Sequence, residues 1–182
     1  MEISKNKHSV KDITFIGLMA ALICIAGPIS INLPFSPVPI SLTNLAIYFA
    51  AIILGFKKGT ISCIVYILIG LVGLPVFSNF SGGFSKIAGP TGGYIVGFIF
   101  MAMIVGIFSD IFNGKRYMYV IGMVLGTIVT YAIGTLYLSF QTHMALISAI
   151  AAGVLPFIAG DIIKMVIVVI FAPEIKKRVA MF

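Results

Sequence analysis

Long apolar runs separated by short polar stretches are the feature that most constrains the fold of this 182-residue chain. A helix that spans the hydrocarbon core of a bilayer needs about 20 predominantly apolar residues, and each run is close to that length. The runs cover Ile13–Ile31, Ile40–Phe56, Thr60–Val76, Tyr94–Phe112, Tyr117–Leu138 and Val154–Phe171. We therefore predict an all-α integral membrane protein with six transmembrane helices.

Composition supports this class and limits what else the chain can contain. Hydrophobic residues make up 60% of the sequence and charged residues only 9%, whereas soluble domains are about 25% charged. Six spans with short loops leave no room for a soluble domain, so we expect one membrane domain over residues 1–182, with residues 1–12 as a cytoplasmic N-terminal segment. The nearest approach to an ATP-binding P-loop, Gly55–Thr60, has the wrong spacing. Any use of ATP must then come from a partner.

The distribution of positive charge predicts the topology. The formal net charge is +7, and ten of the twelve cations lie in four short stretches. These stretches are Lys5, Lys7 and Lys11; Lys57 and Lys58; Lys115 and Arg116; and Lys176, Lys177 and Arg178. They alternate with nearly uncharged loops, the pattern by which cytoplasmic loops are recognised. We expect both termini in the cytoplasm of a cell-membrane protein, and the basicity indicates no nucleic-acid partner.

The loops on the opposite side are longer and richer in glycine and proline. Residues 32–39 hold three prolines, residues 75–93 hold five glycines, and a third loop runs from Ser139 to about Gly153. Irregular backbone beside a bilayer is costly unless protein covers it or it lines a wet cavity. These loops therefore predict a ligand pocket near the outer face.

Two ionisable residues in the last apolar run are the sharpest candidates for a site. Asp161 and Lys164 are three residues apart, so they share one helical face. A charge in hydrocarbon is costly, and such residues usually face a cavity or a partner. The pair is either a structural ion pair or a polar ligand site in which Asp161 accepts from ligand N–H groups.

Other residues give weaker signals. Asn79 and Lys86 lie in the second outer loop, Gly92 offers close backbone approach at the start of the fourth run, and Tyr94 could stack on a ligand. Each of them also fits a purely structural role. The cysteines show no metal-ligand spacing, and no catalytic motif is present, so we predict neither a metal site nor enzymatic activity.

Several segments together resemble one family. These are residues 33–41, residues 70–77, Gly89–Tyr94 with Gly97 and Phe98, and Gly160–Lys164. They are similar to the BioY family, the biotin-specific substrate-binding component of energy-coupling factor (ECF) transporters. The likeness covers nearly the whole chain from the first span onward. The resemblance implies six helices, a biotin pocket near the outer face, and assembly with a transmembrane coupling protein and two cytoplasmic ATPases.

The resemblance also implies roles for individual residues. Asp161 and Asn79 are expected to meet the ureido ring of biotin, and Lys164 is expected to join the site as its second charged group. Thr43 stands where the family commonly has glutamine, so no role is carried over to it. In the family, small residues on the first helix face the coupling protein. Here the candidate pairs are Gly17 with Ala21, and Ala20 with Cys24.

The chemistry of biotin suits these residues. Biotin has a ureido ring with two donors and one acceptor, a bicycle that prefers apolar walls, and a carboxylate tail. A buried acid can accept from a ureido N–H, an amide can serve the carbonyl or the other N–H, and a lysine can attract the carboxylate. We therefore predict capture and uptake of biotin as the ligand, and we predict no cofactor. The alternatives are a substrate-binding component for another vitamin, an intramembrane enzyme that uses Asp161 and Lys164, and a structural membrane subunit.

Overall fold

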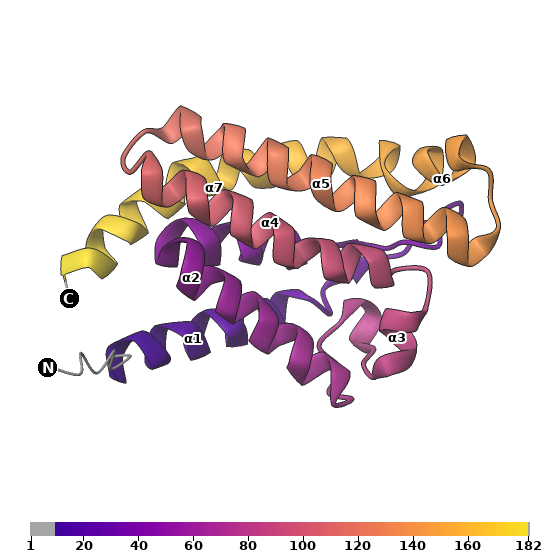
Figure 1. Ribbon diagram of the computed structural model, residues 1–182, viewed down its shortest axis with the longest axis horizontal. Coiled ribbons are helices and arrows are strands. Elements are labelled where there is room, and N and C mark those ends of the chain that lie inside the picture. The colour runs from indigo at the N-terminus through magenta and orange to yellow at the C-terminus, as the bar shows by residue number, and fades with distance from the viewer. Residues whose placement is uncertain (1–9, 182) are drawn as a thin grey trace, which may run out of the picture.

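A computed structural model describes residues 10–181 and shows a bundle of long helices (Figure 1). The long elements are α1 (Val10–Ala26), α2 (Thr43–Leu71), α4 (Gly92–Ile111), α5 (Arg116–Thr142) and α7 (Leu155–Met181). The short elements are β1 (Ser30–Ile31), β2 (Ile40–Ser41), the 3-10 turn η1 (Ser78–Phe80), α3 (Phe84–Ala88) and α6 (Leu146–Gly153). The segments Thr43–Leu71, Gly92–Ile111, Arg116–Thr142 and Leu146–Val179 are each long and apolar enough to cross a membrane. The predicted all-α membrane class is therefore confirmed.

Element α2 contains a sharp turn that divides it into two halves. Gly55 has φ 76° and ψ −172°, a backbone conformation that only glycine adopts without strain. The two halves pack closely against each other. A Cβ placed on Gly59, in the second half, would lie only 2.7 Å from the Cα of Ala51 in the first. The two halves correspond to the second and third predicted spans. The sequence placed the break at Lys57 and Lys58, whereas the chain turns two residues earlier.

Three predicted boundaries are wrong at the ends that carry the outer loops. Helix α2 ends at Leu71, five residues before the predicted Val76. Helix α1 stops at Ala26, before Gly27 and Pro28, and the residues beyond it enter the antiparallel β1–β2 hairpin instead of extending the helix to Ile31. Helix α5 continues through Ser139 to Thr142, and ends where His143 takes the left-handed conformation, φ 54°. Much of the third predicted loop is thus the end of α5 followed by α6.

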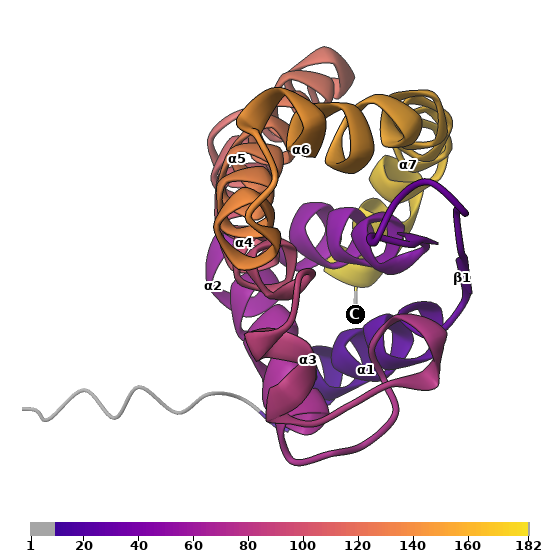
Figure 2. The same ribbon diagram turned by 90° about the vertical axis from the view of Figure 1, so that its right-hand side faces the viewer.

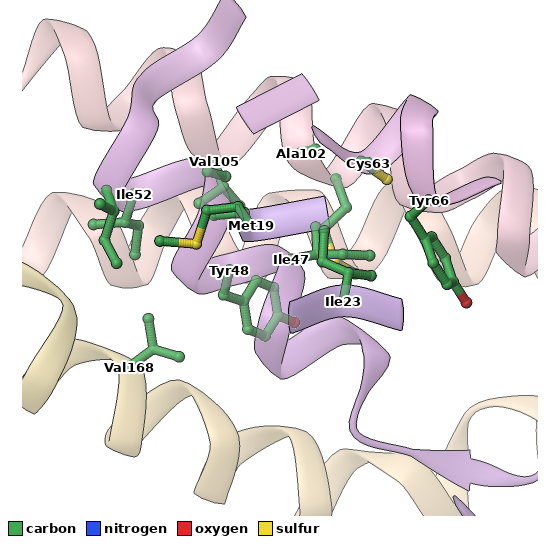
Figure 3. Packing of buried hydrophobic residues seen from close by; sticks show 14 of the residues in the cluster. Met19, Ile23, Ile47, Tyr48, Ile52, Cys63, Tyr66, Ala102, Val105 and Val168 are labelled. Carbon is green, nitrogen blue, oxygen red and sulfur yellow. The ribbon is translucent and has the colours of Figure 1, made fainter. Parts of the chain in front are cut away.

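The main core lies where α1, α2, α4 and α7 meet. Its labelled members in Figure 3 come from all four helices, and Tyr48 and Val105 among them are fully buried. The Tyr48 hydroxyl is 2.5 Å from Thr127 Oγ1, so α2 is also tied to α5 by a buried hydrogen bond. Helices α4 and α5 approach closely through glycine, since a Cβ on Gly97 would lie 3.0 Å from the Thr130 Cα.

The two ends of the bundle differ in character. The described cations of the four basic stretches lie at the end that also holds the first and last described residues; Lys5 and Lys7 are outside the described residues. We call this the basic end. The opposite end, which faces the viewer in Figure 2, holds the β1–β2 hairpin, η1, α3 and α6. We call this the loop end.

Candidate functional site: a charged cluster at a pocket toward the loop end

Asp161 and Lys164 form a buried ion pair on α7. Lys164 Nζ lies 3.1 Å from Asp161 Oδ1, and the residues are 7% and 5% exposed respectively. The three-residue spacing brings both side chains to one face of the helix, as the sequence predicted. A pair this deeply buried is costly unless hydrogen bonds also satisfy its remaining donors and acceptors.

Partners from the start of α2 supply those hydrogen bonds. Besides Asp161, Lys164 Nζ donates to the Ser41 carbonyl oxygen at 2.7 Å and to Asn44 Oδ1 at 2.9 Å. Asn44 Nδ2 in turn donates to Asp161 Oδ1 at 2.6 Å. An ammonium group has three donors, so all three of Lys164 are occupied by the protein itself. The lysine therefore links α7 to the β2–α2 junction.

Tyr131 on α5 completes the cluster from the other side. Its hydroxyl donates to Asp161 Oδ2 at 2.5 Å. A carboxylate oxygen accepts more than one hydrogen bond, so Oδ2 keeps acceptor capacity, whereas Oδ1 already has two donors. The cluster thus presents a negatively charged oxygen that is held in place by three helices.

The sequence did not single out Asn44 or Tyr131. Asn44 is the one amide within residues 43–56, and that isolation in an apolar run could have marked it. Tyr131 is one of seven tyrosines in an aromatic-rich chain, and nothing in its local pattern distinguishes it from a packing residue.

The cluster borders a pocket with mainly apolar walls. One lobe contains the charged cluster, and an adjoining lobe reaches Tyr66 and Phe77. The lobes are contiguous because they share five residues: Val38, Pro39, Ser41, Tyr94 and Phe98. The first outer loop and α4 therefore form the wall common to both lobes.

Two further predicted residues lie at the start of α4. Tyr94 lines both lobes and is 7% exposed, and its hydroxyl donates to the Gly153 carbonyl oxygen at 3.0 Å. Gly92 does not line the pocket lobes. A side chain at Gly92 would overlap the Ile87 carbonyl oxygen, so this glycine allows α3 to pack against α4.

The structure does not bring Asn79 and Lys86 to the charged cluster. Asn79, exposed in η1, donates to Asn32 Oδ1 at 2.6 Å and accepts from the Ser30 hydroxyl at 2.8 Å. It therefore joins the first outer loop to the second beside the pocket. Lys86 is half-buried on α3, and burial lowers the pKa of its ammonium group.

The two predicted small-residue pairs on α1 face different ways. Gly17 and Ala21 are exposed, and nothing lies within 4 Å of a Cβ placed on Gly17. Ala20 is only 2% exposed and Cys24 packs against the core. A helix from another protein can reach the Gly17–Ala21 pair, but Ala20 is covered by this chain.

The fold and the pocket together define a class: a multi-pass helical membrane protein with a partly enclosed, mainly apolar pocket that contains one charged cluster. Within residues 10–181 no three potential metal-ligating acid, histidine or cysteine side chains come together. Residues 3–181 match the BioY family, and the chain belongs to that family.

Individual relatives cover most of this chain. It is 38% identical to the biotin transporter BioY of Thermotoga maritima over 88% of this chain and 93% of that protein. It is 34% identical to the probable biotin transporter BioY of Pyrococcus horikoshii, over 91% and 96% respectively. Its fold matches the crystal structure of the S-component for biotin from an ECF-type ABC transporter, with a TM-score of 0.86, 33% identity and 94% of each chain covered.

Proposed function

We propose that this protein captures biotin at the loop end and takes part in its uptake as the substrate-binding subunit of an ECF-type transporter. The observation that carries the proposal is the Asp161 carboxylate, fixed by three helices at the border of an apolar pocket. The relatives at 38% and 34% identity are named biotin transporter and probable biotin transporter, and these names support the same ligand.

The pocket suits the two halves of biotin. A ureido N–H group can donate to Asp161 Oδ2, and the bicycle can lie against Tyr94 and Phe98. A competitor without the ureido donors would leave the remaining acceptor capacity of the buried Oδ2 unused, with Tyr131 as its one donor, which is how a site of this kind discriminates. Because the donors of Lys164 are occupied, its role is to fix Asp161 and the β2–α2 junction.

Asp161→Asn tests the assignment. The change replaces one carboxylate oxygen by a donor that faces the donors of the ligand, so biotin affinity should fall by about 1.5–3 kcal/mol, the range for a hydrogen bond to a charged group. Equilibrium binding of labelled biotin in detergent measures this loss. Glu174→Gln is the matched control, because it removes the same charge at the exposed basic end. Tight binding by a stable Asp161→Asn protein would refute the site.

The small molecule that co-purifies with the protein separates the remaining alternatives. A mass spectrum showing biotin supports the proposal, and one showing another vitamin would assign a different ligand to the same architecture. Depletion of biotin from solution separates capture from a structural role. Formation of a product from the captured molecule would instead identify an enzyme.

We also propose assembly with a transmembrane coupling protein and two cytoplasmic ATPases, through the exposed Gly17–Ala21 face of α1. Small residues let a partner helix approach closely within the bilayer. Gly17→Leu should then abolish cellular uptake and leave biotin binding by the isolated protein intact. Gly17→Ala is the control and should retain both. Loss of binding in Gly17→Leu would indicate misfolding instead.

The proposed topology has six spans, with the basic end and both termini in the cytoplasm. Lys11, Lys58 and Lys176 border one hollow and Arg116, Lys176 and Lys177 border another, so cations from all four basic stretches gather at one end, in agreement with the positive-inside pattern. A cysteine introduced beside Lys115, with Cys24 and Cys63 replaced by alanine, should be protected from an impermeant thiol reagent on intact cells. Labelling at this site would overturn the topology.

A further inference from the structure

We propose that the seam between α5 and α7 binds one anionic phospholipid, with its phosphate in a basic hollow at the basic end and an acyl chain in the apolar groove below. The inference rests on the membrane location of the chain and not on the identity of the transported ligand. Its two parts are separate hollows that follow one another along the same pair of helices.

The basic hollow lies between the α4–α5 turn and the last turns of α7. Three cations line it, Arg116 from α5 and Lys176 and Lys177 from α7, together with Asn113 and the backbone of Gly114. Arg116 and Lys177 are exposed, so both can turn toward a ligand at the membrane surface.

Acidic groups near the hollow leave an excess of positive charge. Glu174 is 2.8 Å from Arg116 Nη2 and 3.7 Å from Lys177 Nζ, so it compensates part of their charge. Asp110 is directed to the Phe56 N–H at 2.9 Å. Lys176 is held by the hydroxyl and carbonyl oxygens of Ser109, which are neutral. Lys176 also interacts with the charge of Asp110, so three cations face two carboxylates at the hollow, and a phosphate can match the excess positive charge.

The apolar groove begins one helical turn from the basic hollow on both helices. On α5, Val120 follows Arg116 by four residues, and on α7, Ile170 precedes Pro173 by three. The lining of the groove is apolar throughout: Val120, Val124, Ile162, Met165, Val166, Val169 and Ile170.

The order of the two hollows selects the class of ligand. A free phosphate would fill the basic hollow alone, and a neutral hydrocarbon would fill the groove alone. A phospholipid carries an anionic head directly above its acyl chains, which is the order seen along α5 and α7. Basic pockets between transmembrane helices at the cytoplasmic side are suited to anionic head groups.

Native mass spectrometry of the full chain in detergent, titrated with lipid, tests the proposal. Phosphatidylglycerol should bind more tightly than phosphatidylcholine with the same acyl chains. A basic residue near a membrane surface contributes about 1 kcal/mol toward an anionic lipid, roughly a five-fold change in dissociation constant. Arg116→Gln and Lys177→Gln should therefore each weaken phosphatidylglycerol binding about five-fold and leave phosphatidylcholine binding nearly unchanged.

A second variant tests the groove. Val166→Trp, at an exposed position in the groove, should weaken binding of both lipids by blocking the acyl chain. Lys11→Gln combined with Lys57→Gln is the matched control, because it removes two cations of the basic end outside this hollow, and it should keep the lipid preference. Glycerol phosphate should compete poorly, because it has no acyl chain.

Four results would overturn the proposal. Equal affinity for the two lipids would show that the hollow does not select an anionic head group. A loss of phosphatidylglycerol binding in the Lys11 and Lys57 control equal to that in Arg116→Gln would show that only the general charge of the basic end matters. Full competition by glycerol phosphate, with no effect of Val166→Trp, would leave only a phosphate site. Loss of a homodimer in Val166→Trp with lipid binding unchanged would identify the groove as a subunit interface.

Discussion

The region of the pocket and the basic end of the molecule use their acidic residues in opposite ways. Among residues 10–181, Asp12, Asp110 and Glu174 lie at the basic end, where they pair with Lys58, the Phe56 N–H and Arg116. Asp161 alone lies beside the pocket, in a cluster that is nearly closed to solvent.

The difference separates carboxylates that keep contact with solvent from one that is buried beside a pocket. At the basic end the ion-paired side chains keep much of their hydration, so each pair contributes little and can be lost cheaply. At the pocket, three helices hold one carboxylate whose second oxygen still has acceptor capacity. In the proposed site, this remaining acceptor capacity is what a ligand N–H group would use, and the carboxylates at the basic end do not line this pocket.

Breaking the buried pair should have the largest effect on stability. Lys164→Met leaves the Asp161 carboxylate buried without its counter-charge, and losses of this kind are about 3–5 kcal/mol. SDS titration in mixed micelles measures the free energy of unfolding. Asp161→Asn combined with Lys164→Met should be less destabilised than Lys164→Met, because no charge is stranded. Equal losses in both variants would show that packing, not charge, is what Lys164 supplies.

The turn inside α2 should be the most sensitive backbone position at the basic end. Gly55→Ala forces a side chain into a glycine conformation and into the Asp110 carboxylate, so we expect a loss of about 1–3 kcal/mol in the free energy of unfolding. Gly17→Ala is the control, since a Cβ meets nothing there and helical alanine is favoured over glycine by about 0.5–1 kcal/mol. An unchanged free energy of unfolding in Gly55→Ala would show that the turn relaxes to accept the side chain.

The exposed pair at the basic end should have the smallest effect. Arg116→Gln removes the bond to Glu174, where both side chains are about half exposed. Such pairs contribute about 0–1 kcal/mol, so the SDS titration should move by no more than that. A loss comparable with that of Lys164→Met would abolish the distinction drawn between the two regions.

The sequence predicted the class of fold and the central pair, because both depend on local patterns. Hydropathy marks spans residue by residue, and Asp161 and Lys164 are separated by less than one helical turn. The remaining members of the cluster, Asn44 and Tyr131, come from helices far away in the sequence. Only the packing of α2 and α5 against α7 brings them to the carboxylate.

Other features escaped the sequence because neighbouring segments decide them. The left-handed conformation of Asn79 and its bonds to the first outer loop depend on where that loop lies. The orientation of α1 likewise depends on which of its faces the core covers, so the pairs Gly17–Ala21 and Ala20–Cys24 could not be separated by spacing alone.

The turn at Gly55 also fixes the length of the first half of α2. The first half of α2, residues 43–54, advances only about 18 Å at 1.5 Å per residue, whereas the hydrocarbon core is about 30 Å thick. In the proposed topology the β1–β2 segment must therefore cover the rest of that crossing. Asp161 lies six residues, roughly 9 Å, inside α7. In the proposed transporter, a molecule held there would have travelled part of the way across the membrane before the partner ATPases hydrolyse nucleotide.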